Sequence, residues 1–244
     1  MFSNARNHAI NAIGKVMVQE LPFPHFLCKD IFPRKFYQDI LDRLPDKDSY
    51  QSIVGSWRIE TKGMEDITEP YKNRFIITLT KDVVGNFAKK DQTFWLETIR
   101  LLKNPDLMRG ILGKFDSYLR KRFPTGLDQV YFISDIQLIR DFDGYTLGPH
   151  TDIAEKVAVL LIYLPQTADN SDLGTSIYVP KQEGFTCNVG KHYPAENFNQ
   201  IFTAPYVPNT ALGFFKTNKS FHGVEPVSRP KVQRDLIQFS IKHL

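Results

Sequence analysis

The sequence has 244 residues, of which 42% are hydrophobic and 24% charged, and its formal net charge is +4. These values are typical of a globular chain that is long enough for a sizeable core, and they exclude a disordered or low-complexity protein. The basic residues are scattered, and the densest run, Arg120-Lys121-Arg122, predicts a solvated helix end rather than a nucleic-acid-binding surface.

The two cysteines, Cys28 and Cys187, form neither a C-x-x-C pair nor a disulfide framework. We therefore expect a reducing, cytoplasmic location. The first twenty residues contain no apolar stretch of signal-peptide length, since Lys15 interrupts it. The longest apolar run, from Val157 to Leu164, is too short to cross a bilayer, so we expect no membrane span.

The first half of the chain predicts mostly helices, because its apolar residues recur at helical spacing. Asn104-Pro105 is a typical helix start, and Pro33 suits a first helical turn. The expected elements are an amphipathic helix over residues 2–20, an extended segment at 23–28, a helix from Pro33 to Pro45, strands at 56–60 and 74–79, and helices at 92–102 and from 104 to just before Pro124.

From Val130 onward the apolar period shifts towards two, and short apolar runs alternate with glycine-containing turns. This pattern predicts a mixed, mainly β fold with a jelly-roll core. We expect one domain over 1–244, with residues 1–128 as a helical or mixed support region and 129–244 as the core. The long aromatic-bearing segment 181–205 is interpreted as a lid or substrate wall, because long loops in compact domains are usually functional.

Three side chains in the core are candidate metal ligands. His150 and Asp152 are two residues apart, so on a strand they would face the same side. His222 lies on a later strand-like segment that could bring it opposite them. Two imidazoles and one carboxylate on one face of a metal, with open positions left over, suit non-haem Fe(II) in oxygenases. Arg234, which opens the last apolar strand, could clamp a carboxylate through two hydrogen bonds.

These residues resemble the Fe(II)/2-oxoglutarate-dependent oxygenases, nearest to the prolyl-hydroxylase-like branch. The resemblance covers roughly residues 131–244 and rests on five segments in the family's order. They are Pro149-His150-Thr151-Asp152, the strand from Lys156 to Pro165, Gly174-Thr175 with Ile177 to Pro180, the strand from Val207 to Phe215, and His222-Gly223-Val224-Glu225-Pro226-Val227. It implies a double-stranded β-helix core with N-terminal supporting helices, Fe(II) on His150, Asp152 and His222, and 2-oxoglutarate and O2 as cosubstrates.

The sequence departs from the prolyl-hydroxylase pattern at the cosubstrate anchor, which in that branch is usually a lysine soon after the second histidine. Here Lys231 and Arg234 both follow His222. We favour Arg234, because it opens an alternating strand while Lys231 follows Pro230 in a predicted turn. Tyr163 and Tyr145 are further candidates for contact with the cosubstrate, and core packing is the alternative interpretation of Tyr163.

The resemblance implies hydroxylation of an unactivated C–H bond coupled to conversion of 2-oxoglutarate to succinate and CO2. Three hypotheses remain open. The first is an oxygenase of a small-molecule, sugar or lipid-linked substrate. The second is a protein hydroxylase of the prolyl type, and the third is a jelly-roll binding module without catalysis. The sequence does not separate the first two, because fold analogy does not fix a substrate.

Overall fold

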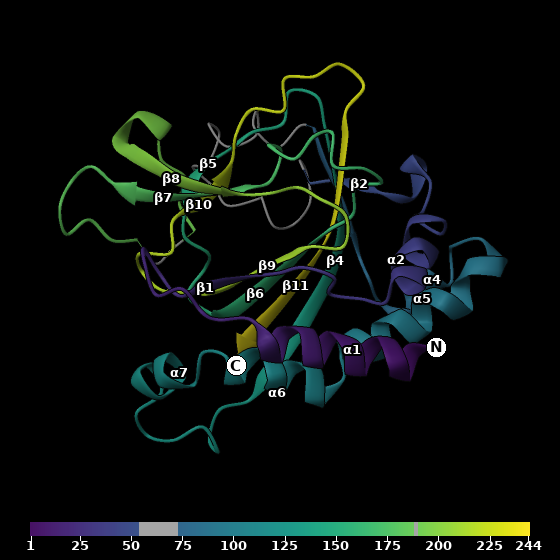
Figure 1. Ribbon diagram of the computed structural model, residues 1–244, viewed down its shortest axis with the longest axis horizontal. Helices are drawn as coiled ribbons and strands as arrows, with labels where there is room; N and C mark the ends of the chain where they lie inside the picture. Colours follow the sequence, from purple (N-terminus) through teal and green to yellow (C-terminus); the bar gives the residue numbers. More distant parts are fainter. Residues whose placement is uncertain (54–72, 188–189) are drawn as a thin grey trace.

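The computed structural model describes residues 1–53, 73–187 and 190–244. Figure 1 shows the strands in the middle of the molecule, with helices gathered on one side of them. The helices are α1 (Phe2–Lys15), α2 (Arg34–Leu41), α4 (Lys81–Val84), α5 (Lys89–Leu102), α6 (Pro105–Gly113) and α7 (Asp116–Arg122), with 3-10 turns η1 (Lys47–Ser49) and η3 (Ala195–Asn197). The strands are β1 (His25–Cys28), β2 (Gln51–Ser52), β3 (Arg74–Thr78), β4 (Phe132–Phe142), β5 (Leu147–His150), β6 (Lys156–Tyr163), β7 (Thr175–Pro180), β8 (Phe198–Ala204), β9 (Ala211–Phe215), β10 (His222–Val224) and β11 (Gln233–His243).

Two antiparallel sheets form the predicted jelly roll. The larger sheet has the strand order β1-β9-β6-β11-β4-β3-β2, and the smaller sheet has the order β5-β10-β7-β8. Strands β1, β2 and β3 come from the first 128 residues, so the amino-terminal region extends the larger sheet as well as covering it. The mainly β fold with a jelly-roll core and supporting helices is confirmed.

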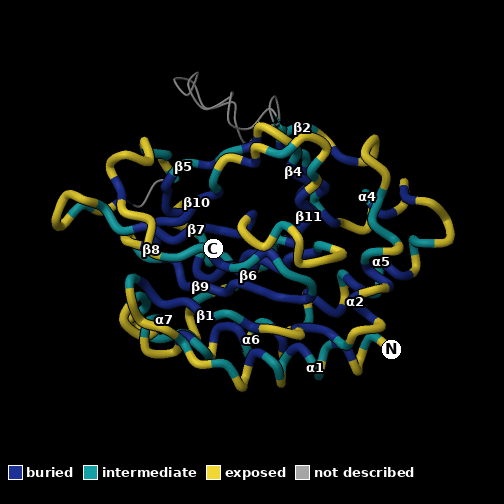
Figure 2. Tube along the Cα trace, turned by 45° about the horizontal axis from the view of Figure 1, so that its top comes forward, coloured by how far each residue is buried: buried dark blue, intermediate teal, exposed yellow. Residues whose placement is uncertain are grey.

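The larger sheet has two apolar faces, because its strands alternate side chains between the helices and the smaller sheet. Leu138, Leu160 and Ile237 belong to the core shared with the helices. Their neighbours Ile139 and Leu236 belong to the core between the two sheets. Figure 2 shows the central strands buried and the exposed residues concentrated in the loops and on the outer sides of the helices. The cavity described below therefore has a wall that is supported from behind by a second apolar layer.

The first helix is shorter than predicted. It buries Ala5, Ala9 and Ile13 but ends at Lys15, because Val16 adopts an extended conformation with φ −76° and ψ 148°. The ammonium of Lys114 donates to the carbonyl of Val16 at 2.5 Å and so satisfies part of the helix end. The predicted continuation to residue 20 is therefore wrong, and Met17 is 83% exposed.

The predicted helix from residue 104 is divided into α6 and α7. Asn104 caps α6 as expected, since its side chain accepts from the amide of Asp106 at 2.9 Å. The interruption lies at Phe115, whose φ of −117° and ψ of 21° are not helical. This residue is fully buried and its ring stacks on that of Phe26 with 5.7 Å between centroids. Tertiary packing of one aromatic ring thus outweighs the helical apolar pattern.

Two further predictions concern the remaining segments. The strand expected at 74–79 is confirmed as β3, whereas the strand expected at 56–60 lies outside the described residues. The segment 181–205 was expected to be irregular throughout, and that is wrong for its last part. Strand β8 begins at Phe198 and pairs with β7 at the edge of the smaller sheet.

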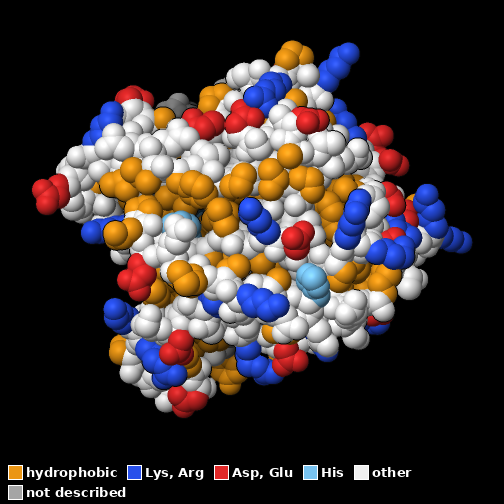
Figure 3. Space-filling view, in the orientation of Figure 1, with side chains coloured by type: hydrophobic (Ala, Val, Ile, Leu, Met, Phe, Trp, Pro, Cys, Tyr) orange, Lys and Arg blue, Asp and Glu red, His pale blue; other side chains and the backbone are white. Residues whose placement is uncertain are grey.

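The surface is mixed in character. Figure 3 shows lysine, arginine, aspartate and glutamate side chains interspersed on the visible face, together with a band of hydrophobic side chains. In the part of the chain that the structure describes, every helix is too short or too polar to cross a bilayer.

Candidate metal centre

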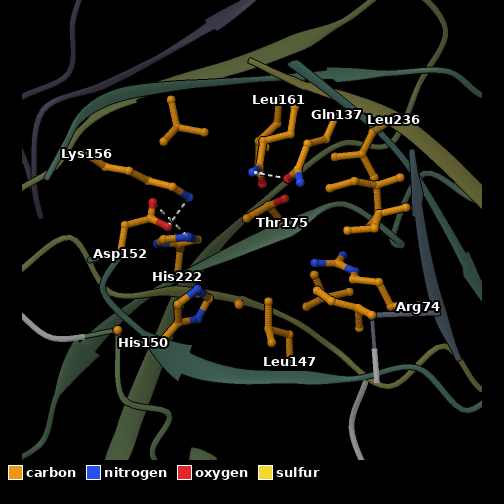
Figure 4. A pocket seen from close by; sticks show the side chains of 18 of the residues that line it. Arg74, Gln137, Leu147, His150, Asp152, Lys156, Leu161, Thr175, His222 and Leu236 are labelled. Carbon is orange, nitrogen blue, oxygen red and sulfur yellow. Dashed lines mark hydrogen bonds and ion pairs between the residues drawn. The ribbon is translucent and has the colours of Figure 1, made fainter. Parts of the chain in front are cut away.

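The two candidate histidines lie opposite each other on neighbouring strands. Strand β10 pairs with β5, and the register places His222 directly across from His150. Asp152 follows the end of β5 rather than lying on the strand, yet its carboxylate still turns to the same side as His150. Each of the three residues offers a ligand atom, and these atoms lie within 4.8 Å of one another (Figure 4). The residues predicted from the sequence therefore converge on one point.

Backbone carbonyls orient both imidazoles. Nδ1 of His150 lies 3.0 Å from the carbonyl oxygen of Gly148, and Nδ1 of His222 lies 2.9 Å from that of Ser220. Since a carbonyl only accepts, each Nδ1 carries the proton and donates it. The Nε2 atoms are then the unprotonated lone-pair donors. Such an outer hydrogen bond is the usual device for orienting a metal-binding histidine.

One carboxylate oxygen of Asp152 has no hydrogen-bond partner among the described residues, although it is buried. This oxygen, Oδ2, lies 3.8 Å from Nε2 of His222, while Oδ1 pairs with the ammonium of Lys156 at 2.5 Å. A buried carboxylate oxygen without a partner is costly. A cation between Oδ2 and the two Nε2 atoms would satisfy it, so the donor set fits a divalent metal with two imidazoles and one carboxylate.

The electrostatics keep all three groups in their metal-binding protonation states. Burial holds the pKa of His150 well below 6.5, and the neighbouring His222 and His192 lower it further. Burial likewise lowers the pKa of His222, against the opposing effect of Asp152. Burial alone would raise the pKa of Asp152, but the charge and hydrogen bond of Lys156 and the charge of His222 together outweigh it and leave the pKa below 3.8. At neutral pH the site therefore offers two neutral imidazoles and one anion.

The triad lies in a cavity of about 210 Å³ between the two sheets. Apolar side chains from both sheets form much of its wall. Lys156 lies beside the triad, whereas Arg74, Gln137 and Thr175 lie away from it (Figure 4). The polar and charged lining residues outside the triad are Arg74, Gln137, Lys156, Thr175, His192, Arg234 and Gln238. The cavity thus has a metal-binding part and a cationic part in one continuous space.

Arg234 lies in the cationic part and is completely buried. Its guanidinium donates to Asp141 at 2.7 Å and to the carbonyl of Leu173, and Nη2 lies 3.5 Å from the hydroxyl of Thr175. Arg74 also pairs with Asp141, using two nitrogens at 2.7 and 2.8 Å. The two guanidiniums share the carboxylate of Asp141, and both arginines line the cavity.

The other cosubstrate candidates occupy different positions. The hydroxyl of Tyr163 accepts from the amide of Thr175 at 3.2 Å, and the ring of Tyr145 lies 4.2 Å from the guanidinium carbon of Arg74. Both tyrosines are buried in the core between the sheets, and neither is among the described residues that line the cavity. Lys231 is exposed in a turn with φ 66°, as the sequence predicted.

His192 belongs to the segment 181–205 that the sequence predicts as a lid; its position there favours a surface-loop residue, with substrate contact as the alternative. His192 forms a β-bridge with His150, and the two rings stack with 4.4 Å between centroids and 7° between planes. Segment 190–193 is held there by the amide of Tyr193, which donates to the carbonyl of Pro149 at 3.0 Å. A third histidine in a long loop gave no strand-period signal, so only tertiary structure could place it in the cavity.

Comparisons with known proteins support the fold. No protein-family model and no curated protein sequence matches this chain. A prolyl 4-hydroxylase from Phytophthora capsici has 12% sequence identity and a TM-score of 0.52, and the match covers 99% of this chain and 65% of that chain. The non-heme alpha-ketoglutarate-dependent epimerase SnoN of nogalamycin biosynthesis has 8% identity and a TM-score of 0.50, covering 97% and 82%.

The chain therefore has the fold of the Fe(II)/2-oxoglutarate-dependent oxygenases. It shares this fold with the prolyl 4-hydroxylase described above.

Proposed function

We propose that the protein is an Fe(II)- and 2-oxoglutarate-dependent oxygenase that hydroxylates a C–H bond of a small-molecule, sugar or lipid-linked substrate. The observation that carries this proposal is the buried triad of His150, Asp152 and His222, whose ligand atoms lie within 4.8 Å of one another. The buried Oδ2 of Asp152 has no hydrogen-bond partner among the described residues, and a bound metal ion would supply one. We further propose that residues 1–244 act as one oxygenase domain.

The charges in the cavity favour a dicarboxylate cosubstrate. Among the described residues that line the cavity, Arg74, Arg234 and Lys156 are cationic. A bound divalent metal would make the cavity still more positive. A dianion such as 2-oxoglutarate would balance that charge, with one end at the metal and the far carboxylate near Arg234 and Thr175.

Each residue then has a defined task. His150, Asp152 and His222 would hold Fe(II), which when bound supplies the O2-dependent oxidation of 2-oxoglutarate and substrate. Lys156 fixes Oδ1 of Asp152 and leaves Oδ2 for the metal. Arg234 would position the far carboxylate of the cosubstrate, and the apolar wall excludes water from the reacting groups.

We propose segment 190–193 as one wall of the substrate entrance, because Gly190 and His192 both line the cavity. Gly190 has φ 72°, and a side chain there would approach Ile153, so this close position requires glycine. The segment is anchored to the carbonyl of Pro149 through Tyr193. This wall is the part of the predicted lid 181–205 that the cavity geometry supports.

The proposal is tested by anaerobic binding followed by turnover. Wild-type protein should bind one Fe(II) and then 2-oxoglutarate, and it should convert 2-oxoglutarate to succinate and CO2 when O2 is admitted. A panel of metabolites, glycans, lipid-linked sugars and proline-containing peptides should contain compounds that accelerate succinate formation. Acceleration by peptides alone would instead assign a protein hydroxylase. Absence of metal binding by the wild-type protein would overturn the oxygenase proposal and favour a binding module.

A further inference from the structure

A second pocket lies outside the proposed active site, between the end of α7 and the end of β9. Its lining residues are Tyr118, Lys121, Arg122, Ala154, Phe215, Lys216, Thr217 and Asn218. Three of them are cationic and none is acidic. The basic run at residues 120–122 therefore does more than end a solvated helix, because part of it forms one side of this pocket.

Arg122 donates hydrogen bonds to backbone carbonyls, and these bonds do not neutralise its positive charge. Its guanidinium donates to the carbonyls of Lys156 at 2.8 Å and Lys216 at 3.4 Å, and also to that of Ala154. All three acceptors are neutral. The hydrogen bonds thus fasten α7 to the segment before β6 and to the end of β9, but they do not neutralise the cation.

Lys216 is the feature that packing does not explain. It is only 4% exposed, and its ammonium donates to the side-chain oxygen of Asn218 at 3.2 Å. Within the described ranges, no carboxylate lies within ion-pair distance of Lys216, Arg122 or Lys121. A buried ammonium without an anionic partner is costly, and methionine would fill the same space without that cost. Burial and then the charge of Arg122 lower the pKa of Lys216, and they outweigh the opposite effects of Asp152 and Glu155, neither of which forms an ion pair with it.

We propose that this pocket is a binding site for a phosphate-type oxyanion, held by Lys216 with Lys121 and Arg122. An oxyanion would supply the missing negative charge and accept hydrogen bonds from Asn218 and Thr217 as well as from the cations. The aromatic rings of Tyr118 and Phe215 form a wall against which the organic part of a phosphomonoester would fit. Binding of the anion here does not require the proposed oxygenase activity.

The pocket is connected to the metal centre through the chain itself. Arg122 binds the carbonyls of Ala154 and Lys156, and the ammonium of Lys156 pairs with Asp152. An anion in the pocket would therefore lie against the same short segment that carries the carboxylate ligand. This arrangement gives the anion a route to affect the metal site without entering the cavity.

The proposal is tested by titrating metal-free protein with inorganic phosphate, with chloride at matched ionic strength as the reference and excess 2-oxoglutarate present. The 2-oxoglutarate blocks phosphate from the cationic part of the active-site cavity. Calorimetry should show saturable phosphate binding to the wild type, and a thermal-shift assay should show stabilisation. Lys216→Met should weaken phosphate binding by at least about tenfold, and Lys216→Arg should restore it.

The matched control is Lys219→Met, which removes an exposed lysine from the same loop and should bind phosphate like the wild type. Without phosphate, Lys216→Met should be at least as thermally stable as the wild type, because it removes a buried ammonium that forms no ion pair with a described carboxylate. Equal phosphate binding by the wild type and Lys216→Met, or no saturable binding by the wild type, would overturn the site. Parallel titration with glycerol 3-phosphate identifies the source of the anion, since tighter binding of the ester indicates a phosphorylated metabolite rather than free phosphate.

Discussion

Nη1 of Arg234 donates to Oδ2 of Asp141 at 2.7 Å, and both side chains are completely buried. Arg74 bonds both oxygens of the same carboxylate, so loss of the aspartate charge removes the anion that the two buried guanidiniums share. Asp141→Asn should therefore lower the free energy of unfolding by about 3–5 kcal/mol, measured by urea denaturation. The control is Asp172→Asn. Asp172 pairs with Arg229 on the surface, where the Arg229 side chain is 43% exposed and the Asp172 side chain 62% exposed. That change should cost no more than about 1 kcal/mol, and equal losses would contradict this role of Asp141.

His222→Ala should remove metal binding while the protein stays folded. The remaining His150 and Asp152 leave too few protein ligands for a stable site, so Co(II) or Fe(II) affinity should fall at least about a hundredfold. His25→Ala is the matched control, since His25 is also buried and its Nδ1 also bonds a backbone carbonyl two residues earlier, at 2.8 Å. Calorimetric titration checks both variants. Wild-type metal affinity in His222→Ala would place the site elsewhere.

Arg234→Ala should weaken 2-oxoglutarate binding at least about a hundredfold. A buried carboxylate without its partner costs about 3–5 kcal/mol, and each ~1.4 kcal/mol of binding free energy changes the Kd tenfold. Fe(II) binding should change little, since Arg234 does not contact the triad residues in the described structure. Lys231→Ala, in an exposed turn, should have only a slight effect. Anaerobic titration with 2-oxoglutarate in the presence of iron measures both. The reverse order of effects would assign the anchor to Lys231.

Gly213 on β9 has no room for a side chain. A Cβ there would lie 2.2 Å from a ring atom of Phe26, which is fully buried and stacked on Phe115. Gly213→Ala should therefore destabilise the fold by about 1–3 kcal/mol through overpacking. Gly14→Ala is the control, because nothing lies within 4 Å of its Cβ position in α1. It should stabilise the protein by about 0.5–1 kcal/mol, and thermal unfolding that ranks the two the other way would contradict this packing argument.

The pKa of His192 is lowered to about 4, first by burial and then by the charges of His222 and Arg74. In the unfolded chain it returns to about 6.5. Between these values the unfolded state binds a proton that the folded state does not, so stability falls as the pH is lowered from 6.5 to 4. His192→Gln should reduce this dependence, measured as the free energy of unfolding of metal-free protein at pH 7 and pH 5. Identical pH dependence in both proteins would show that His192 is not held neutral.

The sequence predicted the parts of the site that follow from local spacing, and it missed those that depend on distant pairing. His150, Asp152 and His222 could be selected from a two-residue spacing and a later histidine, and the structure brings them together. Arg74 lies 67 residues from Asp141 and meets it only because β3 pairs with β4. No periodicity within either segment contains that information.

The same distinction holds for the fold. Alternating apolar residues identified the jelly-roll core, and a capping asparagine identified the start of α6. The end of α1 and the break before α7 depend on Lys114 and Phe115, which act through contacts with distant segments. Helix boundaries set by tertiary contacts are not encoded in the apolar pattern of the helix itself.

The direct pairing of His222 with His150 restricts how this protein can change in length over evolution. Side chains alternate along a strand, so inserting or deleting one residue within β5 or β10 would turn a ligand away from the cavity. The connection between β7 and β8, which does not set that register, can lengthen or shorten while the triad stays intact. Descendants of this chain should therefore keep the length of these two short strands fixed and acquire new substrates mainly through variation in that connection.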